Sequence, residues 1–316
     1  MNQRSSGMDW LLFVLLGFFW GSSYLFIKIG VDAGLAPFTL VATRLLFGFL
    51  LLAAVVVIAR EPLPRRIGMY GHLFVMAILS VALPFSLITW AEQSVDSTLA
   101  ATLNASVPLF VIPIAAFVLI DEKITTNKVI GVVVGFIGVA ILVGFDPGVL
   151  AGTDVLAALA LIGSSVSYAA GGVYARRFAH GLRPMIPAVL QVGFALLIVS
   201  TMAFIFESPI SFPGRFDALL AVVWLGLLGS GLAYLVFFRL LGRWGATRTS
   251  LVAYLLPVYG IALGALVLGE PVDARLVLGT LLVIAGIALV NLRGRWLPAF
   301  GRRAAAPVEP VESPRS

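Results

Sequence analysis

The sequence contains no cysteine and only two histidines, His72 and His180. The absence of cysteine excludes disulfide bonds and thiolate metal sites, and two histidines are too few for a histidine-based metal centre. Neither a G-x-S-x-G nor an H-E-x-x-H pattern occurs, so two common signatures of hydrolytic sites are missing as well. We therefore expect no metal, no cofactor and no enzymatic activity.

Charged residues are scarce too. Of the 316 residues only 11% are charged and 60% are hydrophobic, whereas ordinary soluble domains are about half apolar and about a quarter charged. A soluble protein of this composition would expose apolar patches larger than monomers tolerate, but lipid accepts such a surface. The composition predicts an integral membrane protein.

Apolar runs long enough to cross a bilayer as helices recur along the chain. The first run has no small-residue cleavage site, so we interpret it as a retained span and not as a signal peptide. The predicted fold is an all-α integral membrane protein with ten transmembrane helices, followed by a disordered tail at 298–316. The runs cover residues 8–30, 36–59, 70–91, 97–120, 127–144, 154–175, 185–206, 217–238, 246–268 and 275–292.

Basic residues are unevenly divided between the two sides of these spans. With a cytoplasmic N-terminus, 17 of the 21 Lys and Arg residues lie on the cytoplasmic side, and only Arg215 and Arg275 lie outside. This bias is the positive-inside pattern of membrane proteins. It predicts a multi-pass protein of the inner (cytoplasmic) membrane with both termini in the cytoplasm. It also accounts for the net charge of +6 without a nucleic-acid partner.

The chain contains an internal repeat. The segment PFTLVATRLLFG, which starts at Pro37, aligns with PMIPAVLQVGFA, which starts at Pro184, and Pro108 aligns with Pro257. The repeat predicts two five-helix halves, residues 1–147 and 148–297. Because five is odd, the halves enter the membrane from opposite sides, and this inverted arrangement is typical of alternating-access transporters.

Short motifs follow one another in a fixed order along the spans. They are GFFWGSSY in the first span, TRLLFG in the second, VPLF and IDEKI in the fourth, and YLLPVYG and LVLGEPV in the ninth, with glycine-spaced fifth and tenth spans. Together they resemble an EamA-type member of the drug/metabolite transporter superfamily over about residues 8 to 292, and the resemblance implies a secondary transporter. Two positions of the second repeat differ: Ser167 stands opposite Trp20, and Gln191 stands opposite Arg44.

Polar and aromatic side chains away from the span ends are candidates for a substrate cavity, because inverted repeats place substrate at their mutual interface. The alternative is structural: Trp20 would pack between helices, and the serines would bond to their own backbone. We predict that the cavity is lined by Trp20, Ser22, Ser23, Tyr24, Arg44, Asn104, Tyr168, Tyr174, Gln191 and Tyr254.

Two prolines and two rows of glycines occupy matching places in the repeats. Pro108 and Pro257 remove a backbone donor within the fourth and ninth spans, so we predict a helix break or hinge at each, with packing alone as the alternative. The glycines predict close helix packing; they are Gly131, Gly135, Gly138, Gly279 and Gly286.

Arg44 is the deepest basic residue, about eight residues or roughly 12 Å into its span. A charge at that depth costs several kcal/mol unless it is paired or hydrated. No acid lies near the middle of a span, and the acids Glu122 and Glu270 fall at helix ends, where a solvated or capping role is usual. The first span also lacks the central glutamate of the related small multidrug resistance proteins, which disfavours cationic drugs as substrates.

The sequence thus predicts a secondary transporter that moves a small metabolite by alternating access, in the direction of efflux. The expected substrate is an amino acid or a related neutral, zwitterionic or anionic compound. A membrane channel, a non-transporting membrane scaffold and an intramembrane enzyme remain as alternatives. The expected partners are the small-molecule substrate and the lipid bilayer, with a homodimer left open.

Overall fold

The computed structural model describes residues 7–118, 125–143, 153–178, 182–183 and 185–291. The predicted tail at 298–316, His180 and Glu122 lie outside the described residues. Six of the predicted spans are single helices: α1 (Gly7–Asp32), α2 (Pro37–Ile58), α7 (Thr126–Val143), α8 (Thr153–Phe178), α9 (Met185–Phe206) and α13 (Ala274–Asn291).

The other spans are built from consecutive helical segments. They are α3 (Ile67–Ala77), η1 (Ile78–Ala82) and α4 (Leu83–Ala91); α5 (Ser97–Asn104) and α6 (Val107–Val118); α10 (Phe216–Trp224), η2 (Leu225–Leu232) and α11 (Ala233–Thr249); and η3 (Ser250–Tyr254), α12 (Leu255–Leu263) and η4 (Gly264–Leu268). Within the described residues, nine helical stretches are long and apolar enough to cross a membrane, and a shorter apolar helix covers Ala274–Val290.

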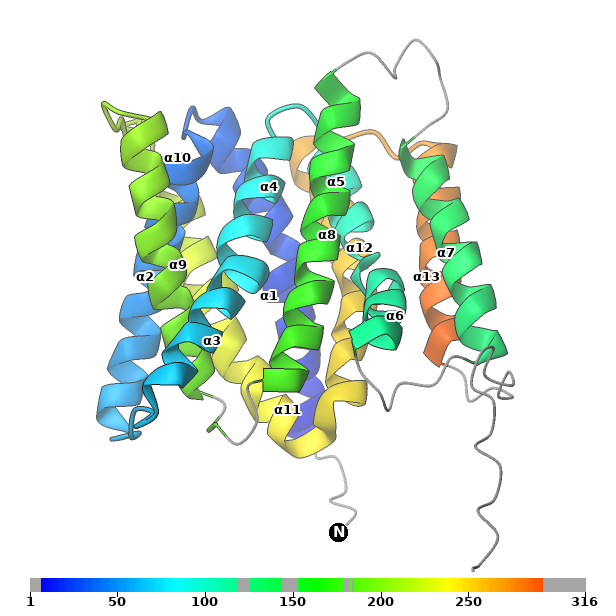
Figure 1. Cartoon of the computed structure of the whole chain (residues 1–316). Coiled ribbons are helices and arrows are strands. Elements are labelled where there is room, and N and C mark those ends of the chain that lie inside the picture. The colour runs from blue at the N-terminus through cyan, green and yellow to red at the C-terminus, as the bar shows by residue number, and fades with distance from the viewer. Residues whose placement is uncertain (1–6, 119–124, 144–152, 179–181, 184, 292–316) are drawn as a thin grey trace, which may run out of the picture.

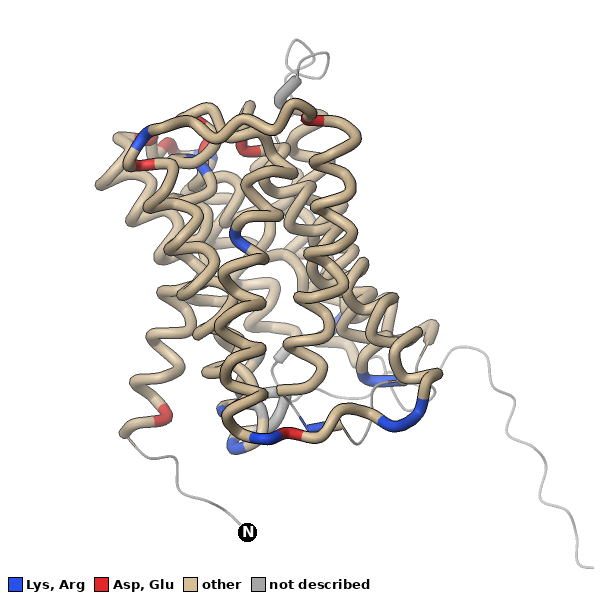
Figure 2. Tube along the Cα trace, turned by 90° about the vertical axis from the view of Figure 1, so that its left-hand side faces the viewer, with Lys and Arg blue, Asp and Glu red and all other residues tan. Residues whose placement is uncertain are grey.

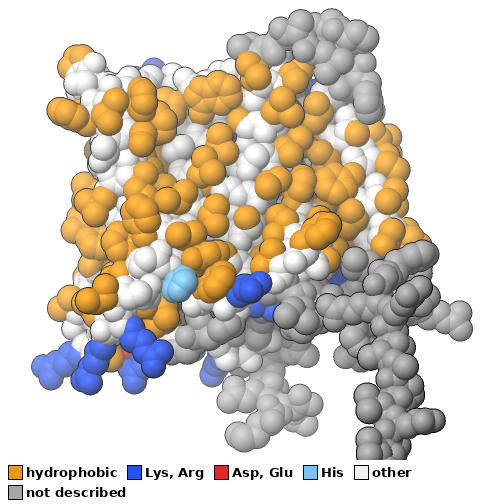
Figure 3. Space-filling model, viewed as in Figure 1, with side chains coloured by type: hydrophobic (Ala, Val, Ile, Leu, Met, Phe, Trp, Pro, Cys, Tyr) orange, Lys and Arg blue, Asp and Glu red, His pale blue; other side chains and the backbone are white. Residues whose placement is uncertain are grey.

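The helices run side by side, and large apolar side chains cover the lateral face shown in Figure 3. Ile58, Phe117 and Leu266 are each more than four-fifths exposed, at 81%, 92% and 84%. Lipid rather than water is the solvent that stabilises such a surface. The chain is therefore a multi-pass helical membrane protein.

Charged residues gather at the two ends of the bundle, as Figure 2 shows. We call the end at which α1 begins the basic end, and the opposite end the acidic end. The basic end holds Arg60, Arg65, Arg66, Arg183, Arg239 and Arg243. The acidic end holds Asp32, Glu92, Glu207, Glu270 and Asp273.

Wider π-helical turns occur in the middle of two spans. In η1 the cause is local: Pro84, two residues after its end, has no backbone N–H and cannot continue the α-helical bonding pattern. In η2 the sequence LGLLGSGL supplies small residues, and η2 packs against α2 there. A Cβ on Gly226 would lie 2.8 Å from the Arg44 carbonyl oxygen, so only glycine allows this approach.

One boundary differs from the prediction. The sequence predicts a polar break between residues 238 and 246, but α11 is helical through Thr249 and meets η3 directly. The segment RLLGRWGATRT contains good helix formers, and its two glycines do not interrupt the helix. The polar character of this segment marks the end of the apolar run but not the end of the helix.

The helices α7 and α13 pack along one another at one flank of the molecule (Figure 1). A Cβ on Gly286 would lie 2.6 Å from the Gly131 carbonyl oxygen, and one on Gly138 would lie 2.8 Å from the Gly279 carbonyl oxygen. Real side chains do not fit at these distances, so the backbones meet without side chains between them. The predicted packing role of the glycine rows is confirmed.

We expect Gly286→Ala to destabilise the protein by about 1–3 kcal/mol, because the added methyl group forces the two helices apart. The matched control is Gly172→Ala in α8, where a Cβ would meet no atom within 4 Å. The control should be neutral or slightly stabilising, since alanine favours the helix. Thermal unfolding of the purified variants measures both effects, and equal stability of the two would contradict the packing interpretation.

Candidate functional site

A cluster of buried polar side chains lies where α1, α5 and α8 meet. Asn104 Nδ2 donates to the Tyr24 hydroxyl oxygen at 2.6 Å. Ser164 and Ser165 donate to Asn104 Oδ1 at 3.1 and 3.2 Å. All four side chains are buried. We call these residues the central cluster; they place hydroxyl and amide groups inside an otherwise apolar bundle.

Arg44 lies in α2 beside this region and is only 3% exposed. Its guanidinium carbon lies 4.2 Å from the centre of the Phe85 ring. The Nη2 and Nε atoms donate to Ser230 Oγ at 3.3 and 3.4 Å, which are long hydrogen bonds. Within the described residues no carboxylate pairs with Arg44, and Ser230 is its hydrogen-bond acceptor. A guanidinium has five N–H donors, so most of its capacity is unused.

Three tyrosines, Tyr24, Tyr168 and Tyr234, lie close enough to Arg44 to interact electrostatically with its charge, and so does Glu92. Tyr168 packs with its ring 6.5 Å from that of Phe85, the ring beneath Arg44. The structure therefore brings four of the predicted cavity residues into one region: Tyr24, Arg44, Asn104 and Tyr168.

Other predicted cavity residues of α1 make contacts that also fit the structural alternative. Trp20 packs on Tyr234 and Phe237 of α11, with ring centres 6.5 and 5.4 Å apart. Ser22 and Ser23 both donate to the Phe19 carbonyl oxygen, at 3.2 and 2.9 Å. Ser22 Oγ also accepts a hydrogen bond from Trp224 Nε1 at 3.1 Å, which ties α1 to α10.

Tyr174 lies apart from the central cluster. Its hydroxyl is 2.8 Å from His72 Nδ1, and its ring packs on Phe178 at the last turn of α8. Gln191 is buried in α9, and Tyr254 is partly buried at the end of η3 against the large core cluster.

The two predicted prolines lie beside changes of helix type. The fourth span is interrupted at Ala105 and Ser106, and Pro108 is the second residue of α6. In the ninth span, the 3₁₀ turns of η3 give way to α12, of which Pro257 is the third residue. Proline at the start of a helix lacks only a donor that would be unpaired there in any case.

Sequence reasoning missed Ser164, Ser165, Phe85 and Ser230. The repeat offered a signal for the two serines, because GSSVSY in α8 resembles GSSY in α1, the segment that nominated Tyr24. Phe85 and Ser230 carry no such signal, since an aromatic ring and a serine in apolar helices are usually packing residues.

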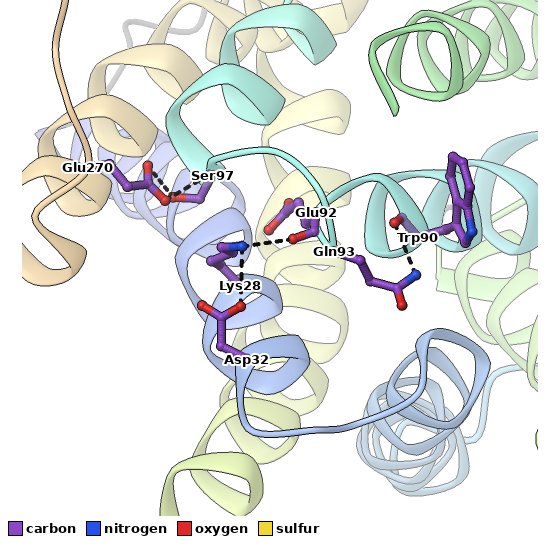
Figure 4. A network of polar contacts seen from close by, with 7 residues as sticks. All are labelled: Lys28, Asp32, Trp90, Glu92, Gln93, Ser97 and Glu270. Carbon is purple, nitrogen blue, oxygen red and sulfur yellow. Dashed lines mark hydrogen bonds and ion pairs between the residues drawn. The ribbon is translucent and has the colours of Figure 1, made fainter. Parts of the chain in front are cut away.

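Carboxylates connect the first half of the chain to the second at both ends of the bundle. At the acidic end, Glu270 accepts hydrogen bonds from the Ser97 and Thr98 backbone N–H groups at 2.8 and 2.9 Å and from Ser97 Oγ at 3.0 Å (Figure 4). The first N–H groups of a helix have no partner within it, so Glu270 caps α5 across the repeats. This is the capping role that the sequence predicts for Glu270.

Glu207 makes the second connection at the acidic end. It accepts from the Phe38 and Thr39 backbone N–H groups, each at 2.7 Å, at the start of α2. At the basic end the connections are ion pairs. Asp9 pairs with Arg243 at 2.6 Å, and Glu61 pairs with Arg183 at 2.7 Å.

A cavity of about 850 Å³ opens at the basic end between α1, α2, α9 and α11. Its wall is mainly apolar and includes Leu12, Val55 and Phe238, while charge comes from Glu61, Arg183 and Arg239. None of the residues that line it belongs to the central cluster.

Apolar helices around a buried polar centre, with polar connections at both ends, define a multi-pass helical membrane protein. The EamA-like transporter family model matches residues 8–144 and again 155–292. The chain belongs to this family, which confirms the resemblance seen in its motifs. It is a membrane transporter.

Curated relatives support the same conclusion, and a solved structure shares the fold. The "Uncharacterized transporter YoaV" of Bacillus subtilis (strain 168) is 26% identical over 270 residues, which cover 85% of this chain and 91% of that protein. The "Uncharacterized inner membrane transporter YedA" of Escherichia coli (strain K12) is 30% identical over 298 residues, covering 93% and 91%. A crystal structure with 22% identity has a TM-score of 0.61 and covers 90% of this chain and 96% of that chain, which shows a shared fold.

Proposed function

We propose that this protein is a secondary transporter that moves a small zwitterionic or anionic metabolite across the cytoplasmic membrane by alternating access. The observation that carries the proposal is Arg44: a buried guanidinium with spare donors beside the central cluster. A charge held in an apolar bundle by one neutral acceptor is costly. A carboxylate or phosphate group of a substrate would supply the missing partner.

The architecture that we propose is ten spans in two inverted five-helix repeats. Two features support it. The π-helical segments η1 and η2 lie at corresponding places, residues 78–82 and 225–232, near the alignment offset of the repeat. The broken fourth span and the 3₁₀-to-α transition of the ninth also correspond, with Pro108 and Pro257 beside them. Matched irregular segments in two repeats are typical of transport pathways.

Alternating access requires the connections at one end of the bundle to break while the connections at the other end form. The carboxylate connections at the acidic end and the ion pairs at the basic end have this character, because each joins one repeat to the other. We further propose that the basic end faces the cytoplasm, as the positive-inside bias favours. Export as the net direction stays a prediction.

The test is a thermal-shift screen of the purified protein with amino acids, their derivatives and small carboxylates, because a substrate stabilises the state that it binds. A compound that raises the unfolding temperature is then used in proteoliposomes. Saturable uptake that is stimulated by the same unlabelled compound inside would support a carrier. Flux that neither saturates nor responds to internal compound would indicate a channel and would reject the proposal.

A further inference from the structure

Glu92 differs from the two carboxylates that connect the halves of the chain at the acidic end. It follows the last residue of α4 and is 0% exposed. Neither of its carboxyl oxygens has a hydrogen-bond partner within the described residues. Glu270 and Glu207, by contrast, each accept three hydrogen bonds. Among the residues that the structure describes, the Thr89 hydroxyl, one turn before Glu92, is likewise buried without a hydrogen-bond partner.

The nearest ammonium group does not compensate the Glu92 carboxyl group. Lys28 Nζ donates to the main-chain oxygen of Glu92 at 3.1 Å and pairs with Asp32 at 3.2 Å. In Figure 4 the dashed line from Lys28 ends on that main-chain oxygen, and none reaches the carboxyl group. The lysine charge is therefore already shared with Asp32.

Charged and titratable groups lie on each of the elements that surround Glu92. They are Tyr24, Lys28 and Asp32 of α1, Arg44 of α2, Asp96 before α5, Tyr168 of α8, which packs on α4, and Glu270 after η4. Arg44 is directed at Ser230 and Phe85, and Glu270 repels a second negative charge. A buried carboxylate without hydrogen bonds or a dedicated cation is unfavourable, and such groups take up a proton.

We propose that Glu92 is a proton-binding site of this transporter: its carboxyl group is neutral while the acidic end is closed, and it releases the proton to water when that end opens. On release the carboxylic acid becomes a carboxylate, and the Lys28 ammonium lies close enough to pair with it after a change of side-chain conformation. The inference rests on the proposed function, because only alternating access would expose Glu92 to one side of the membrane at a time. It adds an ion, the proton, to the solutes that the protein binds.

Infrared difference spectroscopy on the purified full-length protein tests the proton site without a substrate. Spectra are compared across about pH 5 to about pH 10, a range that includes the proton affinities documented for buried glutamates. We expect the carbonyl-stretch band of a protonated carboxylic acid to disappear as the pH rises. The band should be lost in Glu92→Gln, displaced in Glu92→Asp and retained in Glu207→Gln, whose carboxylate is fully hydrogen-bonded.

The pH dependence of thermal unfolding provides a second measurement. A group that holds its proton more tightly in the folded than in the unfolded chain stabilises the fold at low pH, and this stability is lost as the pH rises. The parent protein should therefore become less stable across that range. Glu92→Gln should lose this pH dependence, and Glu207→Gln should keep it. An unchanged infrared band or an unchanged pH dependence in Glu92→Gln would overturn the proposal.

These measurements separate the two proposals. If the band and the pH dependence both disappear in Glu92→Gln but no compound is transported, the proton site stands and the proposed function fails. If transport is saturable but the parent protein shows no protonated carboxylic acid, the function stands and the proton site fails.

Discussion

Replacing Arg44 by glutamine is expected to reduce transport about tenfold or more while the protein inserts normally. The guanidinium has no carboxylate partner within the described residues and only long hydrogen bonds to Ser230. Its charge is therefore available to an anionic group of the substrate, and a hydrogen bond to a charged group is worth about 1.5–3 kcal/mol, or about tenfold or more in binding. Gln191 occupies the equivalent place in the second repeat, so an amide is compatible with the fold.

The control for this prediction is Arg44→Lys, which keeps the charge but loses the planar array of donors. We expect partial transport from the lysine variant if substrate binding depends mainly on charge. The thermal stability of Arg44→Gln should equal or exceed that of the parent protein, because the substitution removes a buried charge. Parental transport rates in Arg44→Gln would show that the charge is dispensable, and a large loss of stability would show that Arg44 holds the helices together.

Replacing Glu270 by glutamine is expected to open the acidic end. The substitution weakens three hydrogen bonds to the start of α5, two of them from backbone N–H groups. Because glutamine still accepts part of these bonds, we expect a net loss of about 1.5–3 kcal/mol, the contribution of one hydrogen bond to a charged group, so the fraction of molecules open at this end should rise about tenfold to a hundredfold. The chain has no cysteine, which allows a single reporter cysteine to be read without background.

The reporter is Thr98→Cys, because Thr98 is 2% exposed and its backbone N–H, not its side chain, bonds to Glu270. Its reaction with a membrane-impermeant thiol reagent should accelerate in Glu270→Gln. The control is Asp217→Asn, which removes an ion pair with Arg215 that lies within one half of the chain and whose side chains are 60% and 40% exposed. Exposed pairs contribute little, so the control should change the rate only slightly. Equal rates in the parent protein and Glu270→Gln would refute the role of Glu270 in closure.

Much of the fold is predictable because its causes are local to the sequence. Apolar runs and the positive-inside bias follow directly from composition along the chain, and the glycine rows identify the contact of α7 with α13. The end of α11 is not predictable in this way. A helix can continue through a polar segment, as it does to Thr249, when its backbone remains hydrogen-bonded.

The candidate site shows where sequence reasoning reaches its limit. A guanidinium in the middle of a span carries a large free-energy cost, so the sequence alone identifies Arg44 as a candidate functional residue. Its contacts could not be identified in this way, because Phe85 and Ser230 come from helices that meet α2 only in the folded structure. The sequence predicts a cavity role for both Tyr168 and Tyr174, but their offset of six positions corresponds to about 9 Å along the helix, which places Tyr174 outside the centre of the bundle.

The central claim is that Tyr24, Asn104, Ser164 and Ser165 form a site that opens to each side of the membrane in turn. The most direct measurement uses Ser165→Cys as the single cysteine, because Ser165 is 0% exposed in this structure. An impermeant thiol reagent is applied separately to each face of sealed vesicles. We predict slow modification from both faces, with no passage of the reagent across the membrane. Modification from neither face would show that the cluster is a sealed part of the core and would contradict alternating access.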